Sequence, residues 1–262
     1  MKTIRGFQRL KSNREPISMV TCYDTTSAAI VNISDIDAIL VGDSAAMVMH
    51  GFESTVNANL QMLVSHVTAV RKGAPEKFLV ADMPFLAHRK GLELTMDAVE
   101  KLMHAGAQAI KIEGLDRDDP IIPHIVKSGV PVMGHLGLTP QSVHQLGGWV
   151  VQGKNKDAET QILEDAKTLE DLGCFSLVLE MVPAELAKRV TSTLNIPTIG
   201  IGAGPHTSGQ ILVFQDLLGL NAEFNPKFLR RYLNGFELIQ SALNEYNRDV
   251  KSLDFPSTEE SF

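Results

Sequence analysis

Three acidic residues and a lysine stand where apolar runs of the chain end. Asp43, Asp82 and Glu113 each close or follow such a run, and Lys111 precedes Glu113 by two positions. An apolar run that breaks into polar residues is typical of a buried strand emerging at the rim of a sheet. In a parallel α/β barrel the carboxyl ends of all strands open on one face, so we expect these side chains to converge there.

These three carboxylates are candidate metal ligands. Carboxylates gathered in one low-dielectric site repel one another unless a cation lies among them. Oxygen ligands without cysteine favour a hard cation, magnesium before zinc. We therefore expect Asp43, Asp82 and Glu113 to bind a metal ion. For any one of them, capping of the helix that follows its strand is the open alternative.

Lys111 is a candidate substrate contact. It points to the same side of its strand as Glu113 because side chains alternate along a strand. A lysine beside a metal can hold a substrate carboxylate or neutralise the acids, and the two roles are compatible. A small 2-oxo acid suits such a site, since its ketone and carboxylate oxygens chelate the ion. The metal then acidifies the carbon next to the ketone.

Removal of a proton from that carbon needs a base, and Glu180 is the candidate. It ends the apolar run 176–179, so we expect its carboxylate to be partly removed from water, which suits proton abstraction. A cap on the following helix is the alternative role. His135, at the end of another run, could hydrogen-bond the substrate or metal-bound water, or serve the structure alone.

Repeated strand and helix patterns must position these residues. The predicted strands are 17–24, 38–44, 77–83, 107–114, 130–137, 174–181 and 196–204, and an eighth lies within 209–219, as a helical turn leading into a short strand. Helical patterns separate the strands, and crossovers of this length favour a parallel sheet. The sequence thus predicts an α/β fold, a (βα)₈ TIM barrel. A doubly wound open sheet is the alternative, because periodicity does not show whether the sheet closes.

Both ends of the chain carry further helical patterns. Ile4 to Lys11 predicts a short amphipathic helix that caps the bottom of the barrel, and Pro16 ends it. Phe228 to Leu253 predicts a helical extension, followed by a polar tail. Single barrels commonly occupy about 250 residues, so we expect residues 1–262 to form one domain.

Composition narrows the classes of partner. A net charge of −7, from 24 basic and 31 acidic residues, argues against a nucleic-acid partner. Both cysteines, Cys22 and Cys174, lie in apolar runs, where buried reduced thiols and an intracellular location are expected. The basic start lacks the apolar core of a secretory signal, and no apolar run approaches the roughly 20 residues that span a bilayer, so no membrane partner is expected.

Motifs spread over the chain resemble the ketopantoate hydroxymethyltransferase family. In order they are VGDSAAMV, HGFESTV, VADMPF, AGAQAIKIEG, VPVMGHLGLTPQSV, GGWVVQGK, LVLEMVPAELAKRVT, IPTIGIGAG and GQILVFQDLLG, and the likeness includes the tail DFPSTEESF. The resemblance implies a magnesium-dependent barrel of the phosphoenolpyruvate/pyruvate type. It implies transfer of a one-carbon unit from 5,10-methylenetetrahydrofolate to 3-methyl-2-oxobutanoate, giving 2-dehydropantoate for pantothenate synthesis. A cytoplasmic homodecamer is implied as well.

The resemblance also assigns roles by position. It implies metal ligands at Asp43, Asp82 and Glu113, and a proton acceptor at Glu180. Substrate contacts are implied at Asp43, Ser44, Asp82 and Lys111, to which the reasoning from residues adds His135. The chain departs from the family pattern at Asn57, Asn59, Ala98, Val150, Ser208 and Glu260. None of these departures is a proposed metal or base position.

Two other functions stay open at this point. One is a magnesium-dependent lyase or mutase of the same barrel type that acts on a 2-oxo acid without folate. Many such enzymes carry a cysteine on a flexible loop, and neither Cys22 nor Cys174 lies in such a loop. The other is a catalytically silent barrel that binds a ligand. That function predicts the loss of a metal or base residue, and all of these residues are present.

Overall fold

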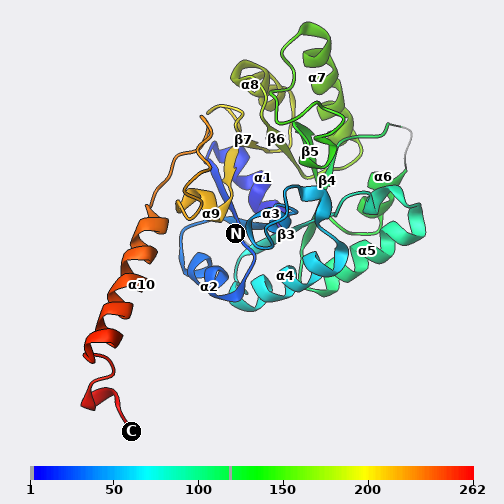
Figure 1. The fold of residues 1–262 in the computed structure, drawn as a ribbon. Coiled ribbons are helices and arrows are strands. Elements are labelled where there is room, and N and C mark those ends of the chain that lie inside the picture. Colours follow the sequence, from blue (N-terminus) through cyan, green and yellow to red (C-terminus); the bar gives the residue numbers. More distant parts are fainter. Residues whose placement is uncertain (1–2, 118–119) are drawn as a thin grey trace. The chain divides into compact units, whose positions relative to one another are not determined.

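The computed structural model describes residues 3–117 and 120–262. Within them, eight parallel strands form a closed barrel in sequence order (Figure 1). The strands are β1 (Ile17–Thr21), β2 (Ala38–Val41), β3 (Phe78–Asp82), β4 (Ala109–Glu113), β5 (Val132–Gly137), β6 (Ser176–Glu180), β7 (Thr198–Ile201) and β8 (Gly209–Leu212). The closed sheet confirms the predicted α/β barrel and excludes the open sheet.

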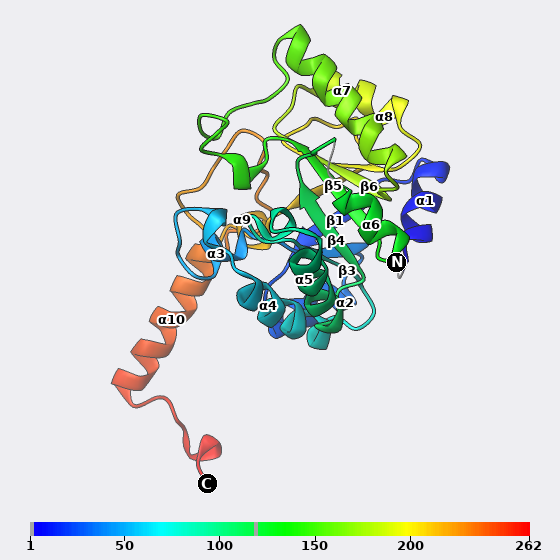
Figure 2. The ribbon, with the colours of Figure 1, turned by 90° about the vertical axis from the view of Figure 1, so that its right-hand side faces the viewer.

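Helices connect the strands and surround the barrel (Figures 1 and 2). They are α2 (Thr25–Ile33), α3 (Ala45–Val48), α4 (Leu60–Gly73), α5 (Leu92–His104), α6 (Ile121–Lys127), α7 (Lys156–Asp171) and α8 (Ala184–Thr193), with 3₁₀ turns η1 (Thr55–Asn57), η2 (Ala87–Arg89) and η3 (Pro140–Ser142). In α4 the buried residues are Leu63, Val67 and Val70, at the helical spacing that packs one face on the sheet.

Strand register places the candidate residues in the barrel interior. The core contains Phe78 and Val80 of β3 and Ala109 of β4, which face inward. Side chains alternate along a strand, so Asp82 continues the inward row of β3, and Lys111 and Glu113 continue that of β4. Their strands are also in register, since Asp82 pairs with Lys111, and Glu113 pairs with His135. The apolar interior therefore becomes polar at the carboxyl end of the barrel.

Helix α1 (Ile4–Asn13) packs against the opposite, amino end of the barrel. The ring of Phe7 is fully buried and meets Phe78 and Phe175 edge to face, with centroid distances of 5.4 and 5.3 Å. Phe78 begins β3, so the helix covers the starts of the strands. The predicted capping helix is confirmed, and it continues to Asn13 rather than ending at Lys11.

The order of elements predicted for residues 209–219 is wrong. The strand β8 comes first, and the helical turn α9 (Phe214–Leu217) follows it. Gly209 pairs with Ile17 of β1, and a Cβ on this glycine would lie 2.4 Å from the Ile17 carbonyl oxygen. The glycine thus permits the close approach of backbones that closes the barrel at its last strand.

The chain forms two compact units, Met1–Val213 and Phe214–Phe262, and the single domain expected over residues 1–262 stays a prediction. In the second unit, α10 (Gly235–Ser252) begins at Gly235 rather than at the predicted Phe228. The guanidinium of Arg231 donates to the carbonyls of Asn221, Ala222 and Phe224 at 3.0 to 3.1 Å, which folds the preceding residues into a loop. In the tail, 3₁₀ turn η4 (Thr258–Glu260) carries a capping box made by Ser257 and Glu260.

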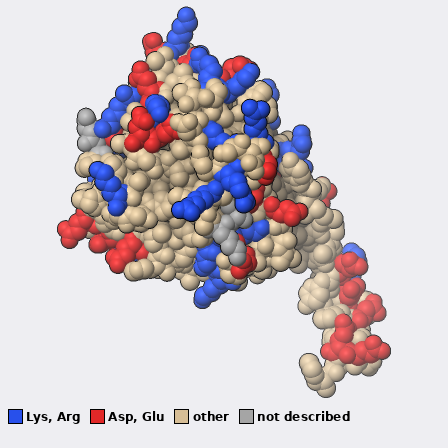
Figure 3. Space-filling view, turned by 180° about the vertical axis from the view of Figure 1, so that it is seen from behind, with Lys and Arg blue, Asp and Glu red and all other residues tan. Residues whose placement is uncertain are grey.

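Basic and acidic side chains are interspersed over the barrel face drawn in Figure 3. No continuous basic region covers this face, which agrees with the negative net charge of −7. Cys22 and Cys174 are both buried free thiols, as expected. Among the described residues, no helix combines the length and the apolar character needed to cross a membrane.

Candidate active site

Lys111 lies at the centre of a polar cluster at the carboxyl end of the barrel. We define this cluster as Asp43, Asp82, Lys111, Glu113 and His135, all buried. The Nζ of Lys111 lies 2.9 Å from Asp82 Oδ1 and 3.2 Å from Glu113 Oε1. Burial lowers the pKa of Lys111, but the attraction of the three carboxylates outweighs it and raises the pKa above the ordinary value. The lysine therefore carries a positive charge.

One oxygen of each aspartate is held by a hydrogen bond. The backbone N–H of Asp43 donates to Asp82 Oδ2 at 2.9 Å, and Gln141 Nε2 donates to Asp43 Oδ2 at 2.9 Å. Burial raises the pKa of both carboxyls, and repulsion from Glu113 raises that of Asp43 further. The other oxygen of Asp82, Oδ1, is buried without a hydrogen bond, although Lys111 lies at ion-pair distance. These two carboxyls would gain from a further positive charge.

His135 lies between two glutamates. Its Nδ1 is 3.3 Å from Glu113 Oε1, and its Nε2 is 3.4 Å from Glu180 Oε2. Burial and the charge of Lys111 lower the pKa of His135, but the two carboxylates raise it to about 9. Burial raises the pKa of Glu113, whereas Lys111, His135 and a backbone N–H lower it to about 2. Glu113 is thus an anion already supplied with partners.

Glu180 is the most open member of this row. Its side chain is 15% exposed, against 2% for that of His135, so it can reach a bound molecule. The end of its strand is fixed by the backbone, because Leu138 N–H donates to the Glu180 carbonyl at 2.8 Å. Gly137 has a φ of +94°, and a Cβ there would lie against that carbonyl. A side chain at position 137 would therefore displace Glu180.

The alternative role of these acids, capping of the helix that follows each strand, does not match their present partners. The carboxylate of Glu180 faces His135, and those of Asp82 and Glu113 accept backbone N–H groups of Asp43 and Gln141 across the barrel end. By contrast, Asp24 at the end of the first predicted strand caps α2 by accepting from Ser27 N–H at 2.8 Å. The structure thus separates a capping aspartate from the clustered acids.

Ser44 and two residues that were not predicted from the sequence, Tyr23 and Gln141, complete the site. Ser44 Oγ shares a hydrogen bond of 2.7 Å with the hydroxyl of the buried Tyr23. Burial raises the pKa of Tyr23, so this hydroxyl stays protonated. Gln141, in turn η3, contacts the cluster through both its side chain and its backbone. The only signal for Tyr23 and Gln141 in the sequence is their position, because each lies a few residues beyond the carboxyl end of a strand.

The donor set of the cluster fits a hard cation. Three buried carboxylates supply oxygen ligands, although Lys111 now lies 2.9 Å from Asp82 Oδ1. As their side chains now lie, the described residues contain no three Asp, Glu, His or Cys grouped to hold an ion. Lys111 occupies the position between Asp82 and Glu113. An ion held by all three acids would therefore require side-chain rotation at these strand ends.

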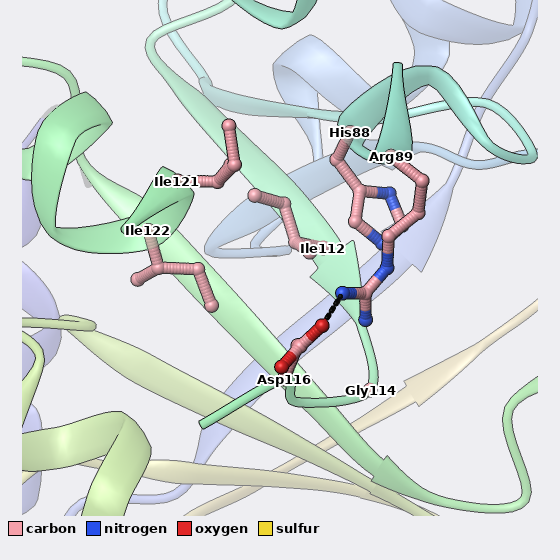
Figure 4. A pocket seen from close by; sticks show the side chains of 7 residues that line it. All are labelled: His88, Arg89, Ile112, Gly114, Asp116, Ile121 and Ile122. Atoms are coloured by element: carbon pink, nitrogen blue, oxygen red, sulfur yellow. Dashed lines mark hydrogen bonds and ion pairs between the residues drawn. The ribbon is translucent and has the colours of Figure 1, made fainter. Parts of the chain in front are cut away.

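A pocket on the outside of the barrel wall is separate from the cluster. It is lined by His88, Arg89, Ile112, Gly114, Asp116, Ile121 and Ile122 (Figure 4). Ile112 faces outward because it alternates with Lys111 and Glu113 along β4. Arg89 and Asp116 form an ion pair of 2.8 Å beside it. The pocket is therefore not part of the candidate active site.

Solved structures define the class of the barrel. The fold is similar to 2,3-dimethylmalate lyase, a PEP mutase/isocitrate lyase superfamily member, with a TM-score of 0.60 and 16% identity over 97% of this chain and 99% of that one. It is similar to phosphonopyruvate hydrolase in complex with oxalate and Mg²⁺, with a TM-score of 0.63 and 10% identity over 99% of this chain and 93% of that one. At such identities the likeness shows the fold alone, that of a TIM barrel.

The sequence comparisons show the family. The family model for ketopantoate hydroxymethyltransferase matches residues 1–258. A relative from Coxiella burnetii (strain CbuK_Q154), named 3-methyl-2-oxobutanoate hydroxymethyltransferase, is 56% identical over 254 residues, covering 97% of this chain and 96% of the relative. The chain therefore belongs to the ketopantoate hydroxymethyltransferase family, which confirms the resemblance found in its motifs. It is an enzyme, a transferase.

Proposed function

We propose that the enzyme transfers a hydroxymethyl group from 5,10-methylenetetrahydrofolate to 3-methyl-2-oxobutanoate, giving 2-dehydropantoate for pantothenate synthesis. Membership of the family and the name of the Coxiella relative support this reaction. One structural observation carries the mechanism. A buried lysine lies among three buried carboxylates on neighbouring strands, with a more open glutamate beside them.

Asp43, Asp82 and Glu113 are the proposed ligands of Mg²⁺. When bound, the ion polarises the ketone and carboxylate of the 2-oxo acid and acidifies the carbon next to the ketone. Both oxygens of Asp82 and both of Glu113 already have partners, and Lys111 is shared between these two acids, so the ion would take the place of Lys111 at one or both of them. Phosphonopyruvate hydrolase, a barrel of the same fold solved in complex with oxalate and Mg²⁺, supports this combination.

Lys111, Ser44 and His135 are the proposed substrate contacts beside the metal ligands Asp43 and Asp82. The ammonium of Lys111 is buried and charged, so it can pair with the substrate carboxylate in place of one of its present carboxylate partners. The hydroxyl of Ser44 can donate to a substrate oxygen while accepting from Tyr23. The pKa of about 9 keeps His135 protonated, and it can donate to the substrate by turning one ring N–H away from Glu113 or Glu180, which now face its two nitrogens.

Glu180 is the proposed base. It takes the proton from the carbon next to the ketone, and that carbon forms the new bond to the methylene carbon of the folate as one of the two methylene C–N bonds breaks. Water supplies the hydroxyl group as the second C–N bond breaks, and tetrahydrofolate is released. His135 lies 3.4 Å from Glu180 Oε2 and can hold the carboxylate toward the cluster. A positioned base of this kind typically contributes about 10²- to 10⁴-fold in rate.

Deuterium exchange from solvent tests the proposal. NMR follows the hydrogen on the carbon next to the ketone of 3-methyl-2-oxobutanoate, with Mg²⁺ or with a chelator, before and after addition of tetrahydrofolate. We expect exchange that depends on the metal, and product once methylenetetrahydrofolate is present. No exchange from folded protein under any condition would reject the proposed chemistry. Cleavage or rearrangement of a 2-oxo acid without folate would replace the transferase with a lyase or mutase.

We also propose that the enzyme is a cytoplasmic homo-oligomer, a homodecamer as the family resemblance implies. Helix α10 supports contacts between copies, because it exposes an apolar stripe at helical spacing. The stripe consists of Phe236, Ile239, Leu243, Tyr246 and Val250, which are 40 to 62% exposed. Such stripes are ordinarily covered by a partner. Sedimentation should show the assembly, and Leu243→Glu should dissociate it; a monomeric wild-type protein would contradict the proposal.

A further inference from the structure

Gln141 joins three strands at the carboxyl end of the barrel. Its side-chain Nε2 donates to Asp43 Oδ2, which follows β2, and to the carbonyl of Met83, which follows β3, both at 2.9 Å. Its backbone N–H donates to Glu113 Oε2 at the end of β4, at 3.0 Å. The residue is buried, with 6% of its surface exposed. One glutamine thus contacts two of the three proposed metal carboxylates.

The orientation of this amide is fixed by its partners. A backbone carbonyl accepts hydrogen bonds and never donates them, so the atom facing Met83 must be the amide nitrogen. The same nitrogen faces Asp43. Both of its hydrogens are then used, and the reversed amide would place its oxygen against two acceptors. Gln141 therefore holds Asp43 in one rotamer, anchored on the backbone of β3.

We propose that Gln141 is a positioning residue for the metal site: it fixes Asp43 Oδ2 so that Oδ1 is presented to the cation. This inference rests on the proposed function. Hydrogen bonds that orient metal ligands typically change metal affinity by about 10- to 100-fold when they are removed.

The test replaces Gln141 with methionine, which has a similar length and no amide donors. Gln161 provides a matched control, because its Nε2 donates to Asp165 Oδ1 at 2.8 Å on the exposed surface of α7. Gln161→Met thus removes the same kind of bond away from the site. Binding of Mn²⁺, a hard ion that substitutes for Mg²⁺ at oxygen ligands, is followed through the electron paramagnetic resonance signal of the free ion.

We expect Gln141→Met to raise the dissociation constant for Mn²⁺ by about 10- to 100-fold. Gln161→Met should change it by no more than about twofold, as surface substitutions do. Raising Mg²⁺ should then restore much of the lost rate in Gln141→Met, since its defect lies in metal binding. A purely structural glutamine would leave the metal dependence unchanged.

The outcomes separate this inference from the proposed function. Tight Mn²⁺ binding by both the wild type and a folded Gln141→Met would overturn the positioning role and leave the metal site standing. Absence of Mn²⁺ binding by the wild type would overturn the metal site and this inference together. If Gln141→Met does not fold, Gln141→Leu provides a second apolar variant. If neither variant folds, the residue serves the structure of the barrel end and the proposal is rejected.

Discussion

The two ends of the same barrel surround lysine side chains with different partners. At the carboxyl end, Lys111 lies among Asp82, Glu113 and His135, all ionisable. At the amino end, Lys77 Nζ donates to the carbonyls of Ser34 and Ile36, both at 2.6 Å. Burial is common to both lysines. The two lysines therefore differ in their partner groups rather than in burial.

Lys11, also at the amino end, has the same kind of partners as Lys77. Its Nζ donates to the carbonyls of Thr191, Leu194 and Ile196 at 2.6 to 3.2 Å, where α8 ends and β7 is about to begin. Neutral carbonyls use all three donors of an ammonium and leave no charged group in need of a partner. Carboxylates crowded around Lys111 leave negative charge in excess, which attracts a cation. We infer that the amino end is built for stability and the carboxyl end for chemistry, as in other TIM barrels.

Glu180→Gln should give the largest effect and tests the carboxyl end directly. The amide keeps the size of the side chain and cannot take up the proton, so exchange of deuterium into 3-methyl-2-oxobutanoate should fall by about 10²- to 10⁴-fold. Substrate affinity, measured by calorimetry with Mg²⁺, should stay nearly unchanged.

Glu170 gives the matched control at the amino end, where it accepts the backbone N–H of Ile196 at 3.0 Å. Glu170→Gln should lower stability and leave the exchange rate per folded molecule unaltered. A loss of substrate binding by Glu180→Gln equal to its loss of exchange would contradict the assignment of the base.

Lys111→Met and Lys77→Met should sharpen the contrast between the two ends. Removal of Lys111 leaves buried carboxylates without their charge partner, so the free energy of unfolding should fall by about 3 to 5 kcal/mol at neutral pH. KM for the 2-oxo acid should rise as well. Lys77→Met leaves two carbonyls without a donor and should lower stability by about 1 to 3 kcal/mol. Urea unfolding measures the change in stability, and steady-state rates measure the change in KM. An altered KM in folded Lys77→Met would contradict the distinction between the two ends.

The polar end of the barrel could be predicted because it follows strand periodicity. Asp82 ends an apolar run, and Lys111 and Glu113 lie two positions apart, which places both on one side of their strand. The charge of these residues also indicates a site, because three acids and a lysine at strand ends are hard to explain as core packing. The roles of these residues in binding and catalysis remain predictions that the experiments above test.

Other features depend on contacts that the local sequence does not reveal. Gln141 meets Asp43 across 98 positions of the chain, and no local pattern indicates which carboxylate a loop glutamine will find. The run GQILVFQDLL suits a short strand and a helical turn equally well, so pairing with β1 decided the order of β8 and α9. The late start of α10 similarly depends on Arg231, which binds carbonyls earlier in the chain.

A buried acid of the second compact unit, Phe214–Phe262, should have the smallest effect on stability when it is replaced. The same replacement tests the dependence of stability on pH. Asp216 in α9 is buried, and its Oδ1 has no hydrogen-bond partner among the described residues. Burial raises its pKa to about 6 from 3.8, and attraction by Arg231 opposes this only in part. Because the folded pKa is the higher one, the stabilising contribution is complete below about pH 4 and is lost as the pH rises through about 6.

Asp216→Asn removes this titration without changing the size of the side chain. Relative to the wild type, the variant should gain roughly 1 to 2 kcal/mol of unfolding free energy between pH 4 and pH 7.5, after relaxation around the charge is allowed for. Urea unfolding of both proteins at several pH values measures the difference. Asp254→Asn, which replaces an exposed acid of the same unit, is the control for the loss of one negative charge. A pH-independent difference for Asp216→Asn would contradict the raised pKa of this acid and would mean that Arg231 pairs with it fully.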